Sequence, residues 1–286
     1  MNTVDLHTHS TFSDGTFTPK ELVIYGAKKG LSALALTDHD TLEGNDEAVF
    51  YGEKYGIEII RGIEISTEYE STELHIVGLF MDNEREELIS ALKGLRESRK
   101  TRNIEMVQKL NEIGININYD EIAESAKGDV ITRAHIAKEV IKKGYASSNN
   151  EVFDRYIGRD KPAYVKRTVL PWQDTLRLIC ESGGLPILAH PLLYRISQRR
   201  LEMILGELAK CGLAGIEAYY STHSASEIKF VKMLADKNRL KLSGGSDFHG
   251  ENKPKLDLGT GYGNLQVPYE VLEGLKKELK SRKSIV

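Results

Sequence analysis

Hydrophobic positions along the first ninety residues alternate between short continuous runs and helical spacing. Thr18 and Pro19 give an N-cap followed by proline, and Gly30 ends the helix that begins there. A second helix is expected over 44–55, before Gly56. The continuous runs are apolar on both faces or nearly so, as in buried strands of a parallel sheet. They predict strands at 3–8, 32–37, 57–65 and 73–80.

The pattern changes in the middle of the chain, where helical spacing continues without a convincing strand. Helices are predicted at 84–113, 119–126, 133–143 and 150–157. Alternation resumes after Pro171. It predicts helices at 172–182, 198–211, 224–238 and 268–282, and strands at 186–189, 214–218 and 240–243. Repeated strand–helix units favour a parallel sheet or barrel with helices outside.

The strandless middle therefore indicates a helical insertion between two segments of one α/β barrel. We expect residues 1–97 to form the first barrel segment and residues 171–286 the second. Residues 98–170 would form the insertion, a cap that binds substrate.

Composition excludes several classes of protein. Of 286 residues, 40% are hydrophobic and 28% charged, as in an ordinary globular protein. No apolar run approaches the roughly 18–20 residues that span a membrane, and the N-terminus does not resemble a signal peptide. With only Cys180 and Cys211, a disulfide scaffold is not expected, which favours the cytoplasm. A net charge of −3 argues against duplex DNA as a partner. The oligomeric state is left open.

One basic stretch, 93–109, carries six basic residues against two acids. We expect it to be a solvated face of the long helix, with guidance of RNA as the alternative.

Histidines and acids recur where the predicted strands end, which is where βα barrels place their chemistry. His7 and His9 are two residues apart on a strand and so point to one face, and Asp247 and His249 share this spacing. The other candidates are Asp14, His39, Glu64, His75 and His190. Nine ligands are too many for one tetrahedral ion, so two or three ions with Glu64 as a bridge are expected. Imidazole and carboxylate without thiolate suit Zn²⁺, Mn²⁺ or Fe²⁺.

Two further acids are placed to support these ligands. Asp38 is expected to orient His39, and Asp5, on the same face as His7, is expected to orient the first histidine pair.

The motifs DLHTHS, TDHD, GIE, SDFH and LAHP, together with the isolated His75, resemble those of the PHP (polymerase and histidinol phosphatase) family. The resemblance implies a distorted (β/α)7, TIM-like barrel with a trinuclear metal centre. It assigns the first metal to His7, His9, Glu64 and Asp247, the second to Glu64, His75 and His190, and the third to Asp14, His39 and His249. A carboxylate at Asp14, where other members can have histidine, implies a harder third site that suits manganese or iron.

A closer resemblance rests on SDGTFTP, TRAHIA, YIGRDKPAYV and GGLPILAHP. These segments are similar to those of small stand-alone bacterial members with a helical insertion. That subgroup includes phosphatases of nucleoside 3′,5′-bisphosphates and 5′→3′ exonucleases of short RNA. The resemblance implies a hydrolase that grips a 5′-phosphate and cleaves the 3′-phosphoester by in-line attack of metal hydroxide. Its substrates would be nucleotides or short single-stranded RNA.

A second, non-reacting phosphate requires cations and hydrogen-bond donors. The candidates are Arg133, His135, Arg159, Lys161 and Tyr164, although a solvated surface or insertion packing would also account for them. His223 follows a strand and is a candidate to protonate the leaving group or to bind substrate, the alternative being a helix N-terminal residue. Tyr219 and Tyr220 could stack a base or pack in the core.

Three other functions compete with this interpretation. A phosphatase of a simple monoester, such as histidinol phosphate, would need no binding site for a second phosphate. A non-catalytic PHP module often lacks metal ligands, whereas all nine positions are filled here. A carbon–nitrogen hydrolase on a similar barrel is disfavoured by the order of the ligands and by the lack of a candidate lysine ligand.

Overall fold

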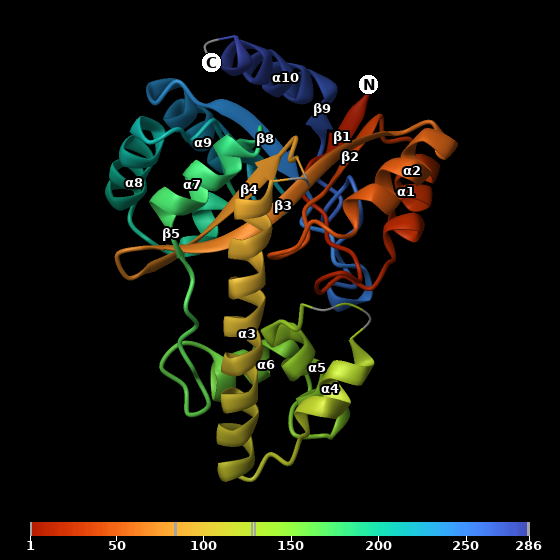
Figure 1. Cartoon of the computed structure of the whole chain (residues 1–286), viewed down its shortest axis with the longest axis vertical. Helices are drawn as coiled ribbons and strands as arrows, with labels where there is room; N and C mark the ends of the chain where they lie inside the picture. The colour runs from red at the N-terminus through yellow and green to blue at the C-terminus, as the bar shows by residue number, and fades with distance from the viewer. Residues whose placement is uncertain (1, 83–84, 127, 129, 285–286) are drawn as a thin grey trace.

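The computed structural model describes residues 2–82, 85–126, 128 and 130–284. One curved sheet forms the centre, in the order β8-β7-β6-β4-β3-β2-β1-β9, and β5 pairs with β3. Helices lie outside it (Figure 1). The strands are β1 (Thr3–Asp5), β2 (Ala33–Leu36), β3 (Glu58–Tyr69), β4 (Thr72–Leu79), β5 (Leu170–Pro171), β6 (Leu185–Leu188), β7 (Gly215–Tyr220), β8 (Lys241–Gly245) and β9 (Val267–Pro268). The barrel helices are α1 (Pro19–Lys28), α2 (Asn45–Tyr55), α7 (Trp172–Glu181), α8 (Gln198–Lys210), α9 (Ala225–Lys237) and α10 (Tyr269–Lys283).

The sheet is nearly closed into a barrel, because the chain after β1 runs beside the end of β8. The Leu6 amide donates to the Gly244 carbonyl at 3.1 Å, and the Asp247 amide donates to the His7 carbonyl at 2.9 Å. This confirms the expected α/β barrel. The first strand is shorter than predicted, since the chain after Asp5 pairs with β8 and the residues that follow it: Leu6 bonds Gly244 and His9 bonds Phe248.

The parallel arrangement expected from the strand–helix units does not hold at β4, which runs antiparallel to both β3 and β6, or at β9, which runs antiparallel to β1. Tyr69 pairs with Thr72, so only two residues connect β3 to β4. Such a turn cannot make the crossover that a parallel pair requires. As a result His75, in the first half of β4, reaches the rim where neighbouring strands end. Glu64 is likewise in the middle of β3 rather than at its end.

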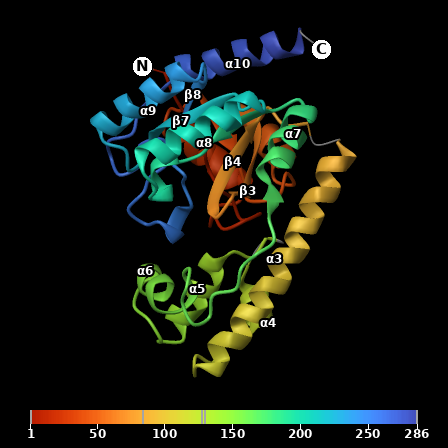
Figure 2. The same ribbon diagram turned by 90° about the vertical axis from the view of Figure 1, so that its left-hand side faces the viewer.

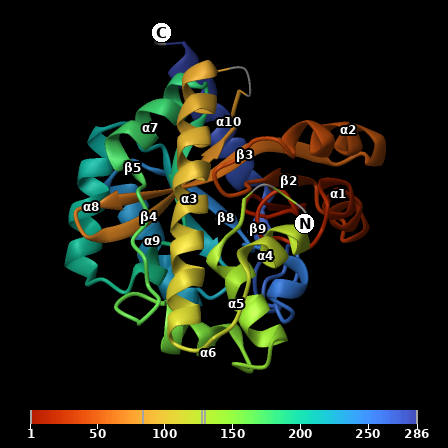
Figure 3. The same cartoon turned by 60° about the horizontal axis from the view of Figure 1, so that its bottom comes forward.

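The central residues form a helical cap built on one long helix, α3 (Glu86–Glu112). Figures 1 and 3 show α3 leaving the barrel, with the other cap elements beside its far half. Those elements are α4 (Tyr119–Ser125), α5 (Arg133–Lys142), α6 (Asn149–Val152) and a π-helical turn at Phe153–Ile157. The predicted helix at 150–157 is thus split between α6 and this turn.

Two hydrophobic cores meet along α3. Leu88, Leu92 and Leu95 pack with the barrel core, whereas Met106 and Leu110 pack in a separate core made of cap residues. The expected boundary between residues 97 and 98 falls inside this continuous helix, between the two cores. Within the described chain, no helix combines the length and apolar character needed to cross a membrane.

Replacing Gly245 with alanine should destabilise the barrel where it closes. The added methyl group would lie 2.4 Å from the His7 amide nitrogen, so β1 and β8 would have to move apart. Overpacking of this kind costs about 1–3 kcal/mol. Gly274→Ala in α10 is the control, because nothing lies within 4 Å of its added methyl group and the helix gains roughly 0.5–1 kcal/mol. Urea unfolding of both variants tests this, and equal stabilities would contradict it.

Candidate metal centre

The nine predicted metal ligands come together at one rim of the barrel. His7 and His9 follow β1, His39 follows β2, and Asp14 folds back over them from the next loop. The other positions are Glu64 in β3, His75 in β4, His190 after β6, and Asp247 and His249 after β8. Most are buried, and only His39 and His75 are partly exposed. His190 and Asp247 have positive φ angles of 27° and 57°, a strained backbone of the kind that concentrates at functional sites.

Glu64 is at the centre of this cluster, with both carboxylate oxygens facing imidazoles. Its Oε2 is 3.3 Å from His7 Nε2, 3.2 Å from His9 Nε2 and 3.1 Å from His39 Nδ1. Its Oε1 is 2.8 Å from His75 Nδ1 and 3.0 Å from His190 Nε2. One carboxylate therefore faces two sets of ligands, which is the arrangement required of a bridge.

Asp14 and Asp247 complete the cluster on the side of His9. Asp14 Oδ1 is 3.2 Å from His249 Nε2 and 3.8 Å from His39 Nε2. Asp247 Oδ1 is 3.3 Å from His9 Nε2. His9 is thus close to the ligands of two of the expected metals, and it joins Asp14, His39 and His249 in one group of converging atoms.

The donor atoms fit divalent metal ions. Four of them, His7 Nε2, His9 Nε2, Asp14 Oδ1 and His39 Nδ1, are buried without a hydrogen-bond partner. Unpaired buried polar atoms are rare in native proteins because they cost free energy. Here they converge, and imidazole and carboxylate donors suit Zn²⁺, Mn²⁺ or Fe²⁺.

Protons should compete with metal at this cluster. Burial acts to lower the pKa of His9, but Asp247 and Glu64 raise it to about 9. Burial also acts to lower the pKa of His75, but the charge of Glu64 and its hydrogen bond raise that pKa to about 9. Since ligand imidazoles bind metal in the deprotonated form, metal affinity should rise between pH 6 and pH 9. Zn²⁺ titrations against a competing chelator test the sign, and an affinity that falls over this range would contradict it.

Glu217 in β7 supports the cluster and was not predicted. Its Oε1 is 3.1 Å from His7 Nδ1, and its Oε2 accepts a 2.7 Å hydrogen bond from the His190 amide. One carboxylate thereby orients two predicted ligands, a role typical of residues behind a metal site. Its signal in the sequence is an acid inside an otherwise apolar strand, GIEAYY.

The two acids expected in this supporting role do something else. Asp5 accepts hydrogen bonds from Ser246 and Gly259, so it holds the loops after β8, and its only contact with His7 is to the backbone. Asp38 accepts from the hydroxyl groups of Ser10 and Ser13 and not from His39. Both predictions are wrong. They assumed that each acid would contact a histidine near it in the sequence, whereas each one bonds to residues in loops that the fold brings close.

Glu217→Gln should loosen the metal centre without unfolding the barrel. The amide keeps the shape but loses the charge that orients the His7 ring. Loss of a supporting carboxylate typically costs about 10–100-fold in metal affinity or activity. Metal content after dialysis is the measurement, with Glu227→Gln, an exposed capping residue, as the control. Equal metal retention in both variants would contradict the assignment.

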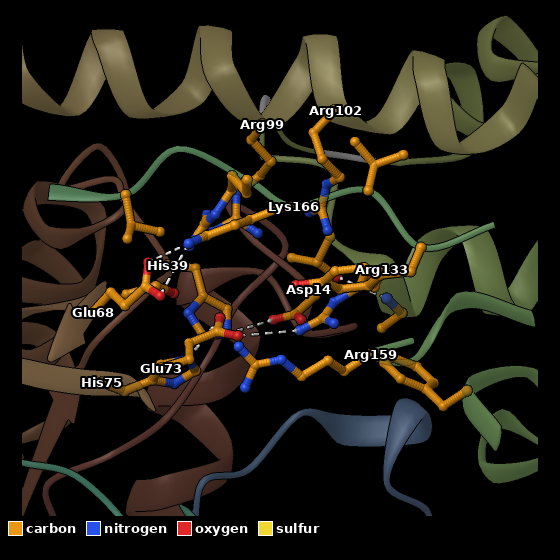
Figure 4. Close-up of a pocket in the computed structure, with 18 of the residues that line it drawn as sticks. Asp14, His39, Glu68, Glu73, His75, Arg99, Arg102, Arg133, Arg159 and Lys166 are labelled. Atoms are coloured by element: carbon orange, nitrogen blue, oxygen red, sulfur yellow. Dashed lines mark hydrogen bonds and ion pairs between the residues drawn. The ribbon is translucent and has the colours of Figure 1, made fainter. Parts of the chain in front are cut away.

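A cavity lined by arginines opens beside the predicted ligands Asp14, His39 and His75. Figure 4 shows Arg99 and Arg102 pointing into it from α3, with Arg133 and Arg159 on another side. Arg167 also lines it. The expectation that residues 93–109 form only a solvated face is therefore wrong for Arg99 and Arg102, which are each 6% exposed.

These arginines differ in their partners. Arg99 and Arg167 both pair with Asp40, the residue after His39. Burial acts to raise the pKa of Asp40, but the two guanidinium groups lower it to about 2. Within the part of the chain that the structure describes, no carboxylate forms such an ion pair with Arg102, and its buried Nε makes no hydrogen bond. Burial and the neighbouring guanidinium groups, Arg99 first, lower the pKa of Arg102 to about 8, so an anion at this point would be stabilised.

Some of the candidates for binding the second phosphate line the arginine cavity and others do not. Tyr164 lines the arginine cavity with Arg133 and Arg159. His135 instead caps α5, accepting from the Thr132 amide at 3.0 Å, and lines a different cavity. Lys161 is outside the residues that line the arginine cavity.

The candidates from β7 and the turn after it are also set apart from the cavity. His223 is 3% exposed, its Nδ1 is 3.0 Å from the Ala218 carbonyl, and it lines none of the described cavities. The structure therefore does not support contact between His223 and a substrate. Tyr220 is buried and donates to Asp247, while Tyr219 packs against the core, so neither is available to stack a base.

Known proteins resemble this chain over most of its length. Residues 5–156 match the PHP domain. A 5′-3′ exoribonuclease of Haemophilus influenzae is 36% identical over 86% of this chain and 89% of its own length. A 3′,5′-nucleoside bisphosphate phosphatase of Chromobacterium violaceum is 32% identical over 91% of both chains. A solved structure described as a Chromobacterium violaceum amidohydrolase with bound sulfate gives a TM-score of 0.88 at 31% identity, covering 98% of this chain and 96% of its own.

Proposed function

The chain belongs to the PHP family and is a metal-dependent phosphoesterase, and we propose that it hydrolyses the 3′-phosphoester of nucleotides that carry a 5′-phosphate. The substrates would be nucleoside 3′,5′-bisphosphates and short 5′-phosphorylated RNA. Two relatives with these activities, each aligned over most of the chain, support the assignment.

One observation supports the proposal above the others: a cavity lined by five arginines, of which Arg99 and Arg102 are buried, shares Asp14, His39 and His75 with the metal centre. A simple monoester would occupy only the metal centre. A bisphosphate would also place its second phosphate against Arg102, Arg133 and Arg159, where guanidinium groups can bind phosphate in a bidentate manner.

The nine predicted ligands would hold two or three ions of Mn²⁺, Fe²⁺ or Zn²⁺, with Glu64 as the bridge. When bound, such ions supply an activated water and stabilise charge on the phosphoryl oxygens. The protein's own contribution is orientation. Glu217 holds the His7 imidazole, the arginines would hold the non-reacting phosphate, and the cap residues Phe153 and Tyr164 enclose that cavity.

Phosphate release with added Mn²⁺ tests the proposal. Adenosine 3′,5′-bisphosphate should be preferred strongly over 5′-AMP, 3′-AMP and an aryl phosphate. Arg133→Ala should reduce this preference, because Arg133 lines the arginine cavity, whereas Arg155→Ala is the control, since Arg155 pairs with Glu151 on the exposed cap surface.

Other outcomes separate the alternatives. Equal or better turnover of simple monoesters would overturn the nucleotide assignment while leaving the metal centre in place. Absence of turnover in protein shown to contain metal would point to a non-catalytic PHP module.

A further inference from the structure

A second cavity, of about 790 Å³, opens from the same metal centre. It shares Asp14, His39 and His75 with the arginine cavity, and it continues toward the segment after β8 and toward α6. In Figure 2 that blue segment and α3, which carries Arg99 and Arg102, lie on opposite sides of the view. A ligand could therefore occupy both cavities while its middle is at the metal centre. Cavities of about 300–1,000 Å³ are typical of small-molecule sites.

The lining of this second cavity suits a phosphodiester chain. Among its described residues, the acids are only the predicted metal ligands Asp14, Glu64 and Asp247. The rest of its polar lining includes Lys253, Lys255 and the side chains of 148–150, a serine and two asparagines. Lys253 Nζ is held 2.6 Å from Asp247 Oδ2, whereas Lys255 is exposed at the mouth.

Tyr262 places an aromatic ring in the lining of this cavity. It is 54% exposed, although the turn that carries it is closely hydrogen-bonded. The Gly261 amide donates to the Asp257 carbonyl and the Gly263 amide to the Thr260 carbonyl, each at 2.8 Å. Both glycines have positive φ, and a methyl group added to Gly261 would lie 2.6 Å from Ser221 Oγ. The ring is thus exposed on an ordered turn, and exposed aromatic rings stack on the bases of single-stranded nucleic acid.

We propose that this second cavity binds the nucleotide on the 3′ side of the scissile phosphate in short 5′-phosphorylated RNA. Its base would stack on Tyr262, and its 3′-phosphodiester would be near Lys255. This inference rests on the proposed function and deepens it by assigning a site to the second nucleotide of an RNA substrate.

The chemistry explains why only a chain needs this cavity. Water oxygen bonds to phosphorus, the bond from phosphorus to O3′ of the first nucleotide breaks, and one water proton ends on that O3′. The phosphoryl group stays on O5′ of the second nucleotide. In a bisphosphate the same phosphorus carries no second nucleotide, so nothing extends toward Tyr262 and Lys255.

The test compares kcat/KM for a 5′-phosphorylated RNA tetranucleotide with kcat/KM for adenosine 3′,5′-bisphosphate, using the Mn²⁺-loaded protein. Tyr262→Ala and Lys255→Glu should each lower the ratio of RNA to bisphosphate hydrolysis by about tenfold. The matched controls are Tyr55→Ala on α2 and Lys277→Glu on α10, both exposed and outside the lining of this cavity. Melting temperatures of all four variants confirm folding.

Three results would count against the proposal, and they are distinguishable. A ratio that stays the same in both variants would overturn the second cavity as an RNA site. Wild-type protein that cleaves the bisphosphate but not the tetranucleotide would do the same, and it would restrict the proposed function to bisphosphates. Wild-type protein that cleaves neither would overturn the proposed function and this inference with it.

Discussion

Glu64→Gln should abolish phosphoesterase activity and remove bound metal while the barrel still folds. Glu64 faces five imidazoles with its two oxygens, so no other side chain can replace it as a bridge. Loss of a supporting carboxylate costs about 10–100-fold, and loss of the bridge should exceed this range. Elemental analysis of purified protein and phosphate release from a bisphosphate are the two measurements.

The number of ions lost from the variant tests whether Glu64 bridges two of them. If Glu64 bridges two ions, the variant should lose more than one ion per chain relative to the wild type. Glu58→Gln, on the same strand but paired with Lys276 away from the cluster, should keep its full metal content. A Glu64→Gln protein with wild-type metal content would rule out the bridge.

Arg102→Ala should selectively weaken hydrolysis of substrates that carry a second phosphate. Arg102 is buried in the cavity that adjoins the predicted metal ligands, and no described carboxylate pairs with it, so the bound anion would be its main partner. A hydrogen bond to a charged group contributes about 1.5–3 kcal/mol, which corresponds to roughly 10–100-fold in kcat/KM. The ratio of kcat/KM for adenosine 3′,5′-bisphosphate to that for 3′-AMP measures the effect.

A matched variant on the same helix separates this effect from loss of positive charge. Lys100 is two residues from Arg102 and exposed, so Lys100→Ala removes a charge from α3 without altering the cavity. An equal loss for both substrates in Arg102→Ala would contradict recognition of the second phosphate and indicate a general effect on the metal centre.

The burial of Arg99 and Arg102 could have been predicted from the helical periodicity of α3. Leu88, Leu92, Leu95, Arg99, Arg102 and Met106 follow one another at spacings of three or four residues. Arg99 and Arg102 therefore occupy the buried stripe of α3, between its contact with the barrel and its contact with the cap. A charged pair inside an apolar stripe is a signal of a buried polar site, and the total charge of residues 93–109 does not distinguish such a pair from the exposed basic residues around it.

Local sequence patterns were sufficient to predict the α/β barrel, the helical insertion and the set of converging metal-type side chains. These follow from local rules: hydrophobic periodicity predicts the elements, and i, i+2 spacing points His7 and His9 to one face. Local spacing could also indicate that Glu64 would point inward from its strand. The ligand candidates could be predicted because each belongs to a short motif at a strand end or on a short apolar strand.

Which distant residues meet depends on the three-dimensional path of the chain. In the fold, β4 runs antiparallel to β3, and Glu217 rather than Asp5 contacts the His7 ring. His135 and His223 are both outside the lining of the arginine cavity. The physical reason is that loop paths and the packing of α3 between barrel and cap are set by contacts between residues far apart in sequence. Periodicity predicts which side of an element is buried, but it does not identify the residues on the opposite side of the contact.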